Sequence, residues 1–144
     1  MKCEVVIDPH GEERVVIYAK EEGDLVARIR ALTEENHTDF VGYQGSEIAQ
    51  IPLSQIYAFV IDDGKVQALC EQAHWQLKER LYTIEQQLPA HFVKINQSCI
   101  VDIRKIARFD TAISGTLKVC LKNGYTDYVS RRQLKHIKER MGIR

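Results

Sequence analysis

The sequence lacks paired cysteines and clustered histidines. Its four cysteines are scattered at Cys3, Cys70, Cys99 and Cys120 with no Cys-x-x-Cys pair, and its five histidines show no metal-ligand spacing. Three of the cysteines lie inside apolar runs, which is typical of buried structural thiols. We therefore expect reduced cysteines in a cytosolic protein, and no metal site.

Long apolar runs are also absent. The longest, residues 57–61, is far too short to span a bilayer, and the N-terminus shows no apolar signal region. These absences predict a cytoplasmic protein. With 144 residues, 44% hydrophobic and 28% charged, the chain is long enough for one packed domain with an ordered extension.

Motifs that carry catalysis are missing as well. There is no phosphate-cradling glycine loop, no pair of metal-ligand motifs and no nucleophile elbow. Asp62 and Asp63 are adjacent carboxylates, but neighbours in a turn seldom converge on one reacting atom. We expect no enzyme activity, no cofactor and no small-molecule substrate.

The net charge of zero hides a division along the chain. Residues 1–90 hold 8 Lys/Arg against 16 Asp/Glu, whereas residues 91–144 hold 12 Lys/Arg against 4 Asp/Glu. A basic C-terminal third is typical of a face that binds a polyanion. The same charges could equally solvate the outside of a helix and two strands.

Periodicity and turn residues predict a mostly β chain of the α+β class. Residues 2–8 and 15–19 are predicted strands, and Asp24 is predicted to cap a helix, so that residues 1–44 form a small β-β-α unit. Residues 45–144 form the second predicted domain. From residue 40 onward the predicted strands are 40–43, 47–52, 57–61, 66–70, 75–77, 92–95, 98–101, 117–121 and 125–129.

Two further helices are predicted. The first runs over residues 78–88, where Pro89 stops it. The second follows Ser130, which is predicted to cap it together with Gln133 in a capping box. Leu134, Ile137 and Met141 form the buried stripe of this last helix, and Gly142 is predicted to end it.

Two polar segments stand out chemically. Asn96, Gln97 and Ser98 interrupt an apolar strand, and amide side chains can pair with base edges while serine commonly contacts phosphate. An ordinary polar turn explains them equally well. Arg131 and Arg132 lie in the first turn of the last helix, where they are unfavourable for the helix dipole unless a phosphate or guanine partner compensates. The alternative is a solvated basic face.

These segments resemble a known family. The residues that carry the resemblance are Phe92-x-Lys94-Ile95-x-x-Ser98-x-Ile100-Val101-x-Ile103-x-x-Ile106, then Leu121-x-Asn123-Gly124-x-x-x-x-Val129-Ser130-Arg131-Arg132, and upstream the stretch 51–59. Together, over roughly residues 45–142, they resemble the LytTR DNA-binding domain of bacterial transcription regulators. The resemblance implies short antiparallel sheets stacked side by side with few helices, and DNA contacts from loops that enter the major groove.

The resemblance also implies where those loops lie. They correspond to Asp63-Gly64-Lys65, to Asn96-Gln97-Ser98 and to Ser130-Arg131-Arg132. The chain departs from the family, which often has His-Arg-Ser at 96–98 and Asn at position 102. In place of a receiver domain stands the acidic unit 1–44, which resembles the extension of short stand-alone members.

We therefore expect a regulator that binds double-stranded DNA. Its expected contacts come from Lys65, Asn96, Gln97, Arg131 and Arg132, supported by Lys94, Ser98, Ser130 and Lys135. A homodimer on repeated half-sites is expected, and a membrane protein is one candidate for a controlling partner. The alternative is a protein-interaction module whose basic C-terminal third docks an acidic partner.

Overall fold

The computed structural model describes residues 2–12, 14–33 and 39–144. The chain divides into two compact units, Met1–Glu35 and Asn36–Arg144, here called the N-terminal unit and the C-terminal unit. The predicted boundary lies between residues 44 and 45, whereas these two compact units meet between Glu35 and Asn36. Strand β1 (Phe40–Gln44) pairs with β2 (Glu47–Ile51) along its whole length, which ties residues 40–44 to the C-terminal unit.

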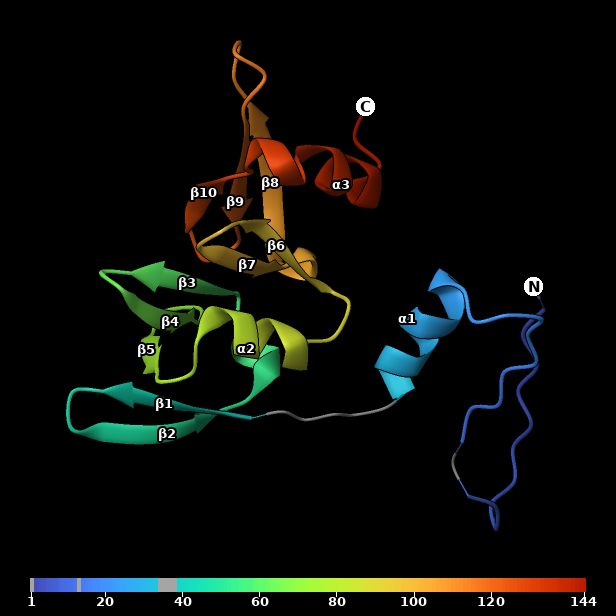
Figure 1. The fold of residues 1–144 in the computed structure, drawn as a ribbon. Coiled ribbons are helices and arrows are strands. Elements are labelled where there is room, and N and C mark those ends of the chain that lie inside the picture. The colour runs from blue at the N-terminus through green and yellow to red at the C-terminus, as the bar shows by residue number, and fades with distance from the viewer. Residues whose placement is uncertain (1, 13, 34–38) are drawn as a thin grey trace. The chain divides into compact units, whose positions relative to one another are not determined.

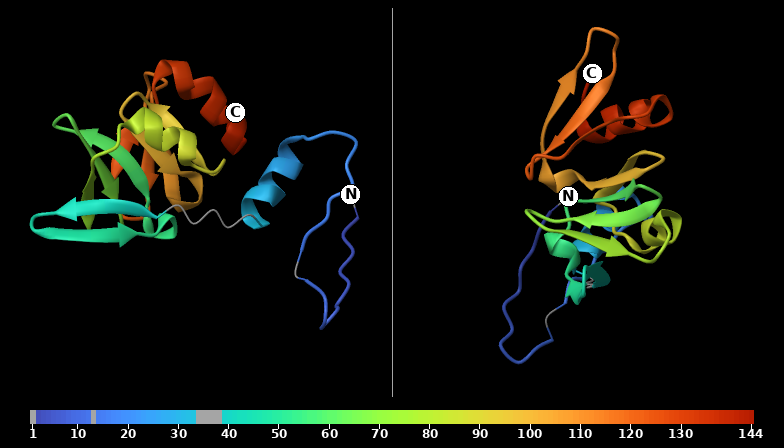
Figure 2. Two further views of the ribbon diagram at one scale, coloured as in Figure 1. Left: turned by 60° about the horizontal axis from the view of Figure 1, so that its bottom comes forward. Right: turned by 90° about the vertical axis from the view of Figure 1, so that its left-hand side faces the viewer.

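The C-terminal unit contains two antiparallel sheets (Figure 1 and Figure 2). The larger has seven strands in the order β2-β1-β5-β4-β3-β7-β6, and the smaller has three in the order β10-β9-β8. The remaining strands are β3 (Ala58–Asp62), β4 (Lys65–Leu69), β5 (His74–Leu77), β6 (Phe92–Asn96), β7 (Cys99–Asp102), β8 (Ile106–Thr111), β9 (Leu117–Leu121) and β10 (Thr126–Tyr128).

Strands β3, β7 and β6 are covered on both faces, because alternate residues enter two different cores. The first core lies on the side of helix α2 (Leu81–Gln87), where the ring of Phe59 packs 5.1 Å from that of Phe40 and 5.8 Å from that of Phe92. The second core lies toward the small sheet and helix α3 (Arg131–Met141). It joins Val60, Ile95 and Val101 to Val119 and Ile137, among others.

The predicted fold class is confirmed: the chain is mostly antiparallel sheet with three helices in the described residues. Each strand predicted in the C-terminal unit is present within about two residues of its predicted ends. Strand β8 escaped prediction, although it pairs with most of β9. Short 3-10 turns also occur at Leu53–Gln55 and Ile103–Lys105. Gly142 ends α3 with φ of 68°, as expected of a glycine at that position.

Two helix predictions need correction. The helix predicted from residue 78 begins at Leu81, because Arg80 is still extended, with φ of −73° and ψ of 150°. Ser130 does occupy the N-cap position of α3, but its side chain makes no capping hydrogen bond. Its backbone N–H is instead donated to the carbonyl of Ile95 at 2.8 Å, so that the helix start is fixed by a strand rather than by a capping box.

The N-terminal unit differs most from its predicted form. Helix α1 (Asp24–Thr33) is present, but neither predicted strand forms in residues 2–12 and 14–23. The two extended segments follow one another after a turn that begins at Asp8, and no backbone hydrogen bond joins them among the described residues. High β propensity without a paired neighbour does not make a strand.

The cysteine prediction is confirmed in the main. All four thiols are free, Cys70, Cys99 and Cys120 are buried, and only Cys3 is exposed. Among the described helices, none has the length and apolar character needed to cross a membrane. No three His, Cys, Asp or Glu side chains of the described residues gather as potential metal ligands.

Asp102, at the end of β7, is the one charged residue that is fully buried within the described ranges 2–12, 14–33 and 39–144. Its Oδ1 accepts the backbone N–H of Arg104 at 2.9 Å and the Arg104 Nε–H at 3.2 Å. The guanidinium of Arg104 also lies 2.8 Å from Nε2 of His91. An asparagine at this position would offer its side-chain carbonyl oxygen to the same backbone N–H.

Replacing Asp102 tests this account. Asp102→Leu removes the buried carboxylate that accepts the N–H groups of Arg104, and we expect the free energy of unfolding to fall by about 1–3 kcal/mol. Asp102→Asn keeps the acceptor and should cost about 1 kcal/mol or less. Urea unfolding followed by the fluorescence of Trp75 measures both losses. Equal losses would mean that the charge, and not the acceptor, stabilises this turn.

Candidate nucleic-acid interface

Loop 1 (residues 62–65) is a tight two-residue turn between β3 and β4. Asp62 pairs with Lys65 across the hairpin, and the turn residues Asp63 and Gly64 have φ of 50° and 71°. Positive φ at both central positions is the geometry that favours Asp-Gly in a hairpin. All four residues are exposed, so loop 1 presents one lysine beside two carboxylates.

Loop 2 (residues 96–98) joins β6 to β7. The Asn96 side chain accepts one hydrogen bond and donates another. Its Oδ1 accepts the N–H of Ser98 at 2.8 Å, and its Nδ2 donates to the carbonyl of Tyr128 at 2.8 Å. Asn96 is half-buried, and its side-chain amide is already hydrogen-bonded within the protein. Gln97 and Ser98 are exposed at the tip of the turn.

Loop 3 (residues 129–132) leads from β10 into α3. Val129 is buried and Ser130 half-buried, whereas Arg131 and Arg132 are exposed in the first turn of the helix. Neither arginine has an ion pair among the described residues. The first-turn N–H groups of α3 receive no side-chain cap, so this end of the helix combines open backbone donors with two cations.

Hydrogen bonds join the three loops in a row. The N–H of Ile61, next to loop 1, donates to the carbonyl of Ser98 in loop 2 at 2.8 Å. Loop 2 is joined to loop 3 by the Asn96–Tyr128 bond and by the Ser130–Ile95 bond. These bonds place the three loops next to one another in the C-terminal unit, whose strands and α3 are labelled in Figure 1.

Comparison with known proteins gives the family. The family model described as "LytTr DNA-binding domain" matches residues 46–142, which is more than half of the chain. The chain belongs to this family. The C-terminal unit is therefore a LytTR domain.

Relatives and a solved structure agree with the assignment. An uncharacterized HTH-type transcriptional regulator of Staphylococcus aureus strain NCTC 8325 is 35% identical over 147 residues, which cover 99% of each chain. One from strain MSSA476 is 38% identical over 110 residues, covering 76% of this chain and 74% of the relative. The LytTr DNA-binding domain of a putative methyl-accepting/DNA response regulator from Bacillus cereus superposes with a TM-score of 0.68 at 20% identity, covering 73% of this chain and 97% of that one.

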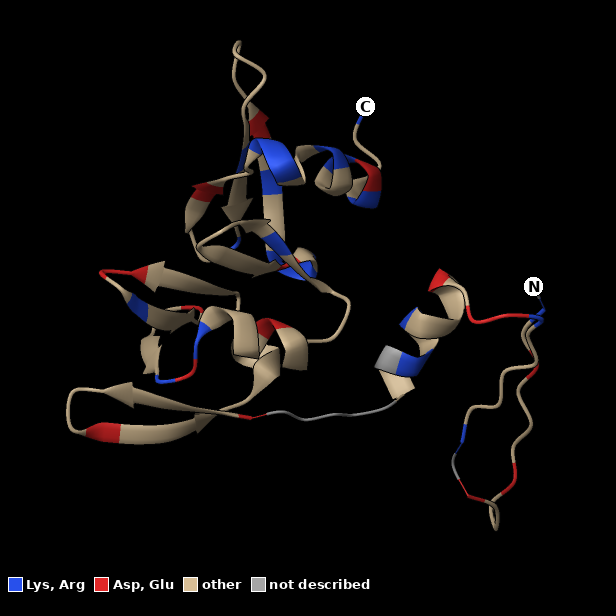
Figure 3. Cartoon of the chain, viewed as in Figure 1, with Lys and Arg blue, Asp and Glu red and all other residues tan. Residues whose placement is uncertain are grey.

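Half of the Lys and Arg residues in the basic C-terminal third form hydrogen bonds or ion pairs within the LytTR domain. Of the 12 Lys/Arg in residues 91–144, six bond to other groups of the domain: Lys94, Arg104, Lys105, Arg108, Lys118 and Arg140. Four of the others are Arg131, Arg132, Lys135 and Lys138, all on α3. The excess positive charge therefore gathers on this helix (Figure 3).

Two of the predicted contact residues lie apart from the loop tips. Lys94 is half-buried on the α2 side of the sheet, with its Nζ 3.9 Å from a carboxylate oxygen of Glu85. Lys135 is exposed one turn beyond Arg131 on α3, so it continues the basic face away from the helix start. Of the predicted set, the three loops bring together Lys65, Asn96, Gln97, Ser98, Ser130, Arg131 and Arg132.

Acidic and aromatic groups beside the loops were not predicted from the sequence. Asp127 accepts the hydroxyl of Tyr125 at 3.1 Å, and burial followed by neighbouring negative groups raises the pKa of Tyr125. Burial, followed by Asp127, likewise raises the pKa of the Cys99 thiol, so this thiol stays protonated and unreactive. The ring of Tyr128 is 55% exposed next to loop 3, and only its β propensity was visible in the sequence.

The dual role of Asn96 can be tested through stability. Asn96→Ala removes the bond to Ser98 within loop 2 and the bond to Tyr128 beside loop 3, and we expect a loss of about 1–3 kcal/mol in the free energy of unfolding. Asn96→Asp keeps the acceptor for Ser98 and should lose less. Gln97→Ala, which removes an exposed side chain next door, should stay within about 0.5 kcal/mol. Urea unfolding checks all three, and an unaffected Asn96→Ala variant would contradict the bonding described here.

Proposed function

We propose that this chain is a bacterial transcription regulator that binds double-stranded DNA in a sequence-specific manner, with loops 1, 2 and 3 entering the major groove. The observation that carries the proposal is the row of three loops joined by hydrogen bonds, with two unpaired arginines at one end. Membership of the LytTR family supports DNA as the polyanion for this surface. The names of the Staphylococcus aureus relatives support a regulatory role.

The loop residues divide by chemistry. Arg131 and Arg132 are exposed and unpaired, and either can make a bidentate contact to guanine. Gln97, at the tip of loop 2, can pair with adenine. A larger group contacts phosphates and so sets the register on the duplex: Lys65, Ser98, Ser130 and Lys135.

Two predicted contact residues take supporting parts. Asn96 positions loops 2 and 3, since its amide is already engaged by Ser98 and Tyr128. Lys94 faces Glu85 and contributes to the surrounding field rather than to a direct contact.

Loop 1 gives the surface a discriminating element. Asp62 and Asp63 flank Lys65 and repel a phosphate backbone that approaches without a fitting sequence. In the right register a carboxylate can accept a hydrogen bond from the amino group of cytosine. Loop 1 therefore favours specificity over raw affinity.

A double substitution tests the proposal. Arg131→Ala with Arg132→Ala removes the guanine contacts, each worth about 1–3 kcal/mol of discrimination, so specific binding should weaken at least about tenfold. The slope of log affinity against log salt should become shallower by about 1–2 for the lost phosphate contacts. Selection of bound fragments from random DNA, followed by titration of the enriched fragment, measures both effects.

The matched control removes the same charge elsewhere. Lys122 and Arg144 are exposed and have no ion pair among the described residues, and Lys122 lies in the turn at the far end of β10 from loop 3. Lys122→Ala with Arg144→Ala should keep the enriched motif. Equal losses of DNA affinity in both double variants would mean that binding depends on net charge and not on these two arginines. Absence of enrichment by the unchanged protein at low salt would favour an acidic protein partner instead.

A further inference from the structure

The N-terminal unit has no core of its own. None of its described side chains is buried, and it holds eight of the large hydrophobic residues that the chain exposes: Val5, Val6, Ile7, Val15, Val16, Tyr18, Leu25 and Leu32. Val6 and Ile7 are 78% and 82% exposed, and Tyr18 is 96% exposed. A unit of this size is below the length at which a single core usually suffices, and oligomerisation is one common remedy.

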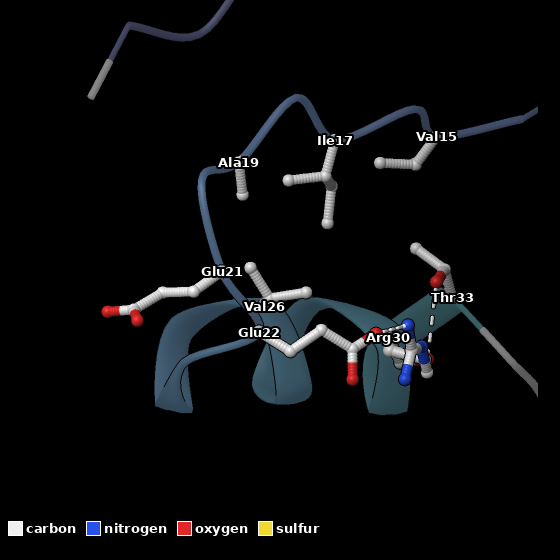
Figure 4. A pocket seen from close by; sticks show the side chains of 8 residues that line it. All are labelled: Val15, Ile17, Ala19, Glu21, Glu22, Val26, Arg30 and Thr33. Atoms are coloured by element: carbon white, nitrogen blue, oxygen red, sulfur yellow. Dashed lines mark hydrogen bonds and ion pairs between the residues drawn. The ribbon is translucent and has the colours of Figure 1, made fainter.

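The segment 14–20 is apolar on two sides. Figure 4 shows Ile17 and Ala19 pointing toward Val26 of α1, around a cavity of about 370 Å³ that Val15 also lines. Val16 and Tyr18 alternate with these residues along the extended chain and are exposed. Apolar residues on both sides of an extended segment are typical of a strand covered on both faces. The cavity is partly open and is also lined by Glu21, Glu22 and Arg30. On the other side of the segment, Val16 and Tyr18 are 57% and 96% exposed, so the described residues of this unit do not cover them.

The backbone N–H and C=O groups of the two extended segments also lack partners for the most part. Among the described residues of the unit, its backbone N–H groups make only three hydrogen bonds beyond those within α1: from Gly11 to the Asp8 carbonyl, from His10 to the Asp8 carboxylate and from Ala27 to the Gly23 carbonyl. Residues 2–8 and 14–20 therefore offer donors and acceptors to a neighbouring chain. Both segments are rich in β-branched residues, which favour such pairing.

Charge identifies the occupant. Segment 2–8 carries Lys2 with Glu4 and Asp8, whereas segment 14–20 carries only Arg14 and Lys20. One segment is thus net acidic and the other basic, so segment 2–8 of one copy complements segment 14–20 of another. In a twofold dimer both pairings form at once, because an isologous interface repeats each contact. DNA is excluded as the occupant, since residues 1–35 hold 9 Asp/Glu against 5 Lys/Arg.

We infer that the N-terminal unit is a dimerisation module in which segments 2–8 and 14–20 pair with those of a second copy of this chain. The pairing covers Val16 and Tyr18 and fills the cavity beside α1. The Staphylococcus aureus relative aligns over 99% of both chains, so this unit is a shared part of the protein and not a stray extension. The dimer delivers two LytTR domains to one DNA molecule.

The test places charge in the module of the full-length protein. Val6→Glu with Val16→Glu should convert a dimer of twice 16.6 kDa into a monomer in sedimentation velocity. The control is Val41→Glu with Ile48→Glu, two exposed apolar residues on β1 and β2 of the LytTR domain, 47% and 68% exposed, and it should remain dimeric. Trp75 lies on β5, so unchanged Trp75 fluorescence shows that the LytTR domain remains folded in each variant.

Hydrogen exchange supplies a second measurement. Amides of segments 2–8 and 14–20 should become more protected as protein concentration rises, which docking within one chain would not produce. A monomeric unchanged protein would overturn the inference, as would a dimer that dissociates only in the control variant. Binding to a DNA fragment with a single half-site should persist in Val6→Glu with Val16→Glu. A protein that dimerises without binding DNA would overturn the proposed function alone.

Discussion

The burial of β3, β7 and β6 on both faces constrains the rest of the LytTR domain. Alternate residues of these strands enter two cores, so most of their positions are apolar, and the half-buried Lys94 of β6 is the exception within a strand. The exposed polar side chains gather where the strands end. Loops 1 and 2 are those ends, and the shared β3–β7 pairing fixes them side by side. The same sheet that forms the two cores therefore also aligns the candidate DNA surface.

The helix start at loop 3 shows how tertiary packing can outweigh the local preferences of a helix terminus. Cations in the first turn of a helix disfavour it by about 0.3–1 kcal/mol each, and the Ser130 side chain makes no capping bond to offset this. The helix is held instead by Ile137 in the second core and by the backbone bond from Ser130 to Ile95. Tertiary packing thus allows two arginines at a position where an isolated helix would favour acidic residues.

The sequence predicted those parts whose pattern was local. The Asn123-Gly124 turn, with alternating residues on either side, predicted β9 and β10. The polar residues 96–98 within an apolar run predicted loop 2. Strand β8 escaped because Arg108 and Asp110 give it a polar outer side that a strand prediction reads as a loop. The strands predicted in residues 2–8 and 15–19 failed for the opposite reason: their propensity is high, but a strand needs a partner that the single chain does not supply. The hydrogen bond from the Asn96 side chain to the carbonyl of Tyr128 joins residues 32 apart in the chain, which no local pattern reveals.

The names of the relatives refer to a helix-turn-helix, but the described residues of the LytTR domain contain none. Such a motif needs two helices joined by a short turn, with the second lying in the major groove. Here α2 is followed by β6, and α3 follows β10 and is the last element. Leu134, Ile137 and Met141 hold one face of α3 in the second core, which leaves its N-terminus and outer face to meet a ligand. The strand-end loops and the start of α3 are therefore the candidate DNA surface of this domain, because the one described helix that borders them presents its N-terminus and not a second helix of such a motif.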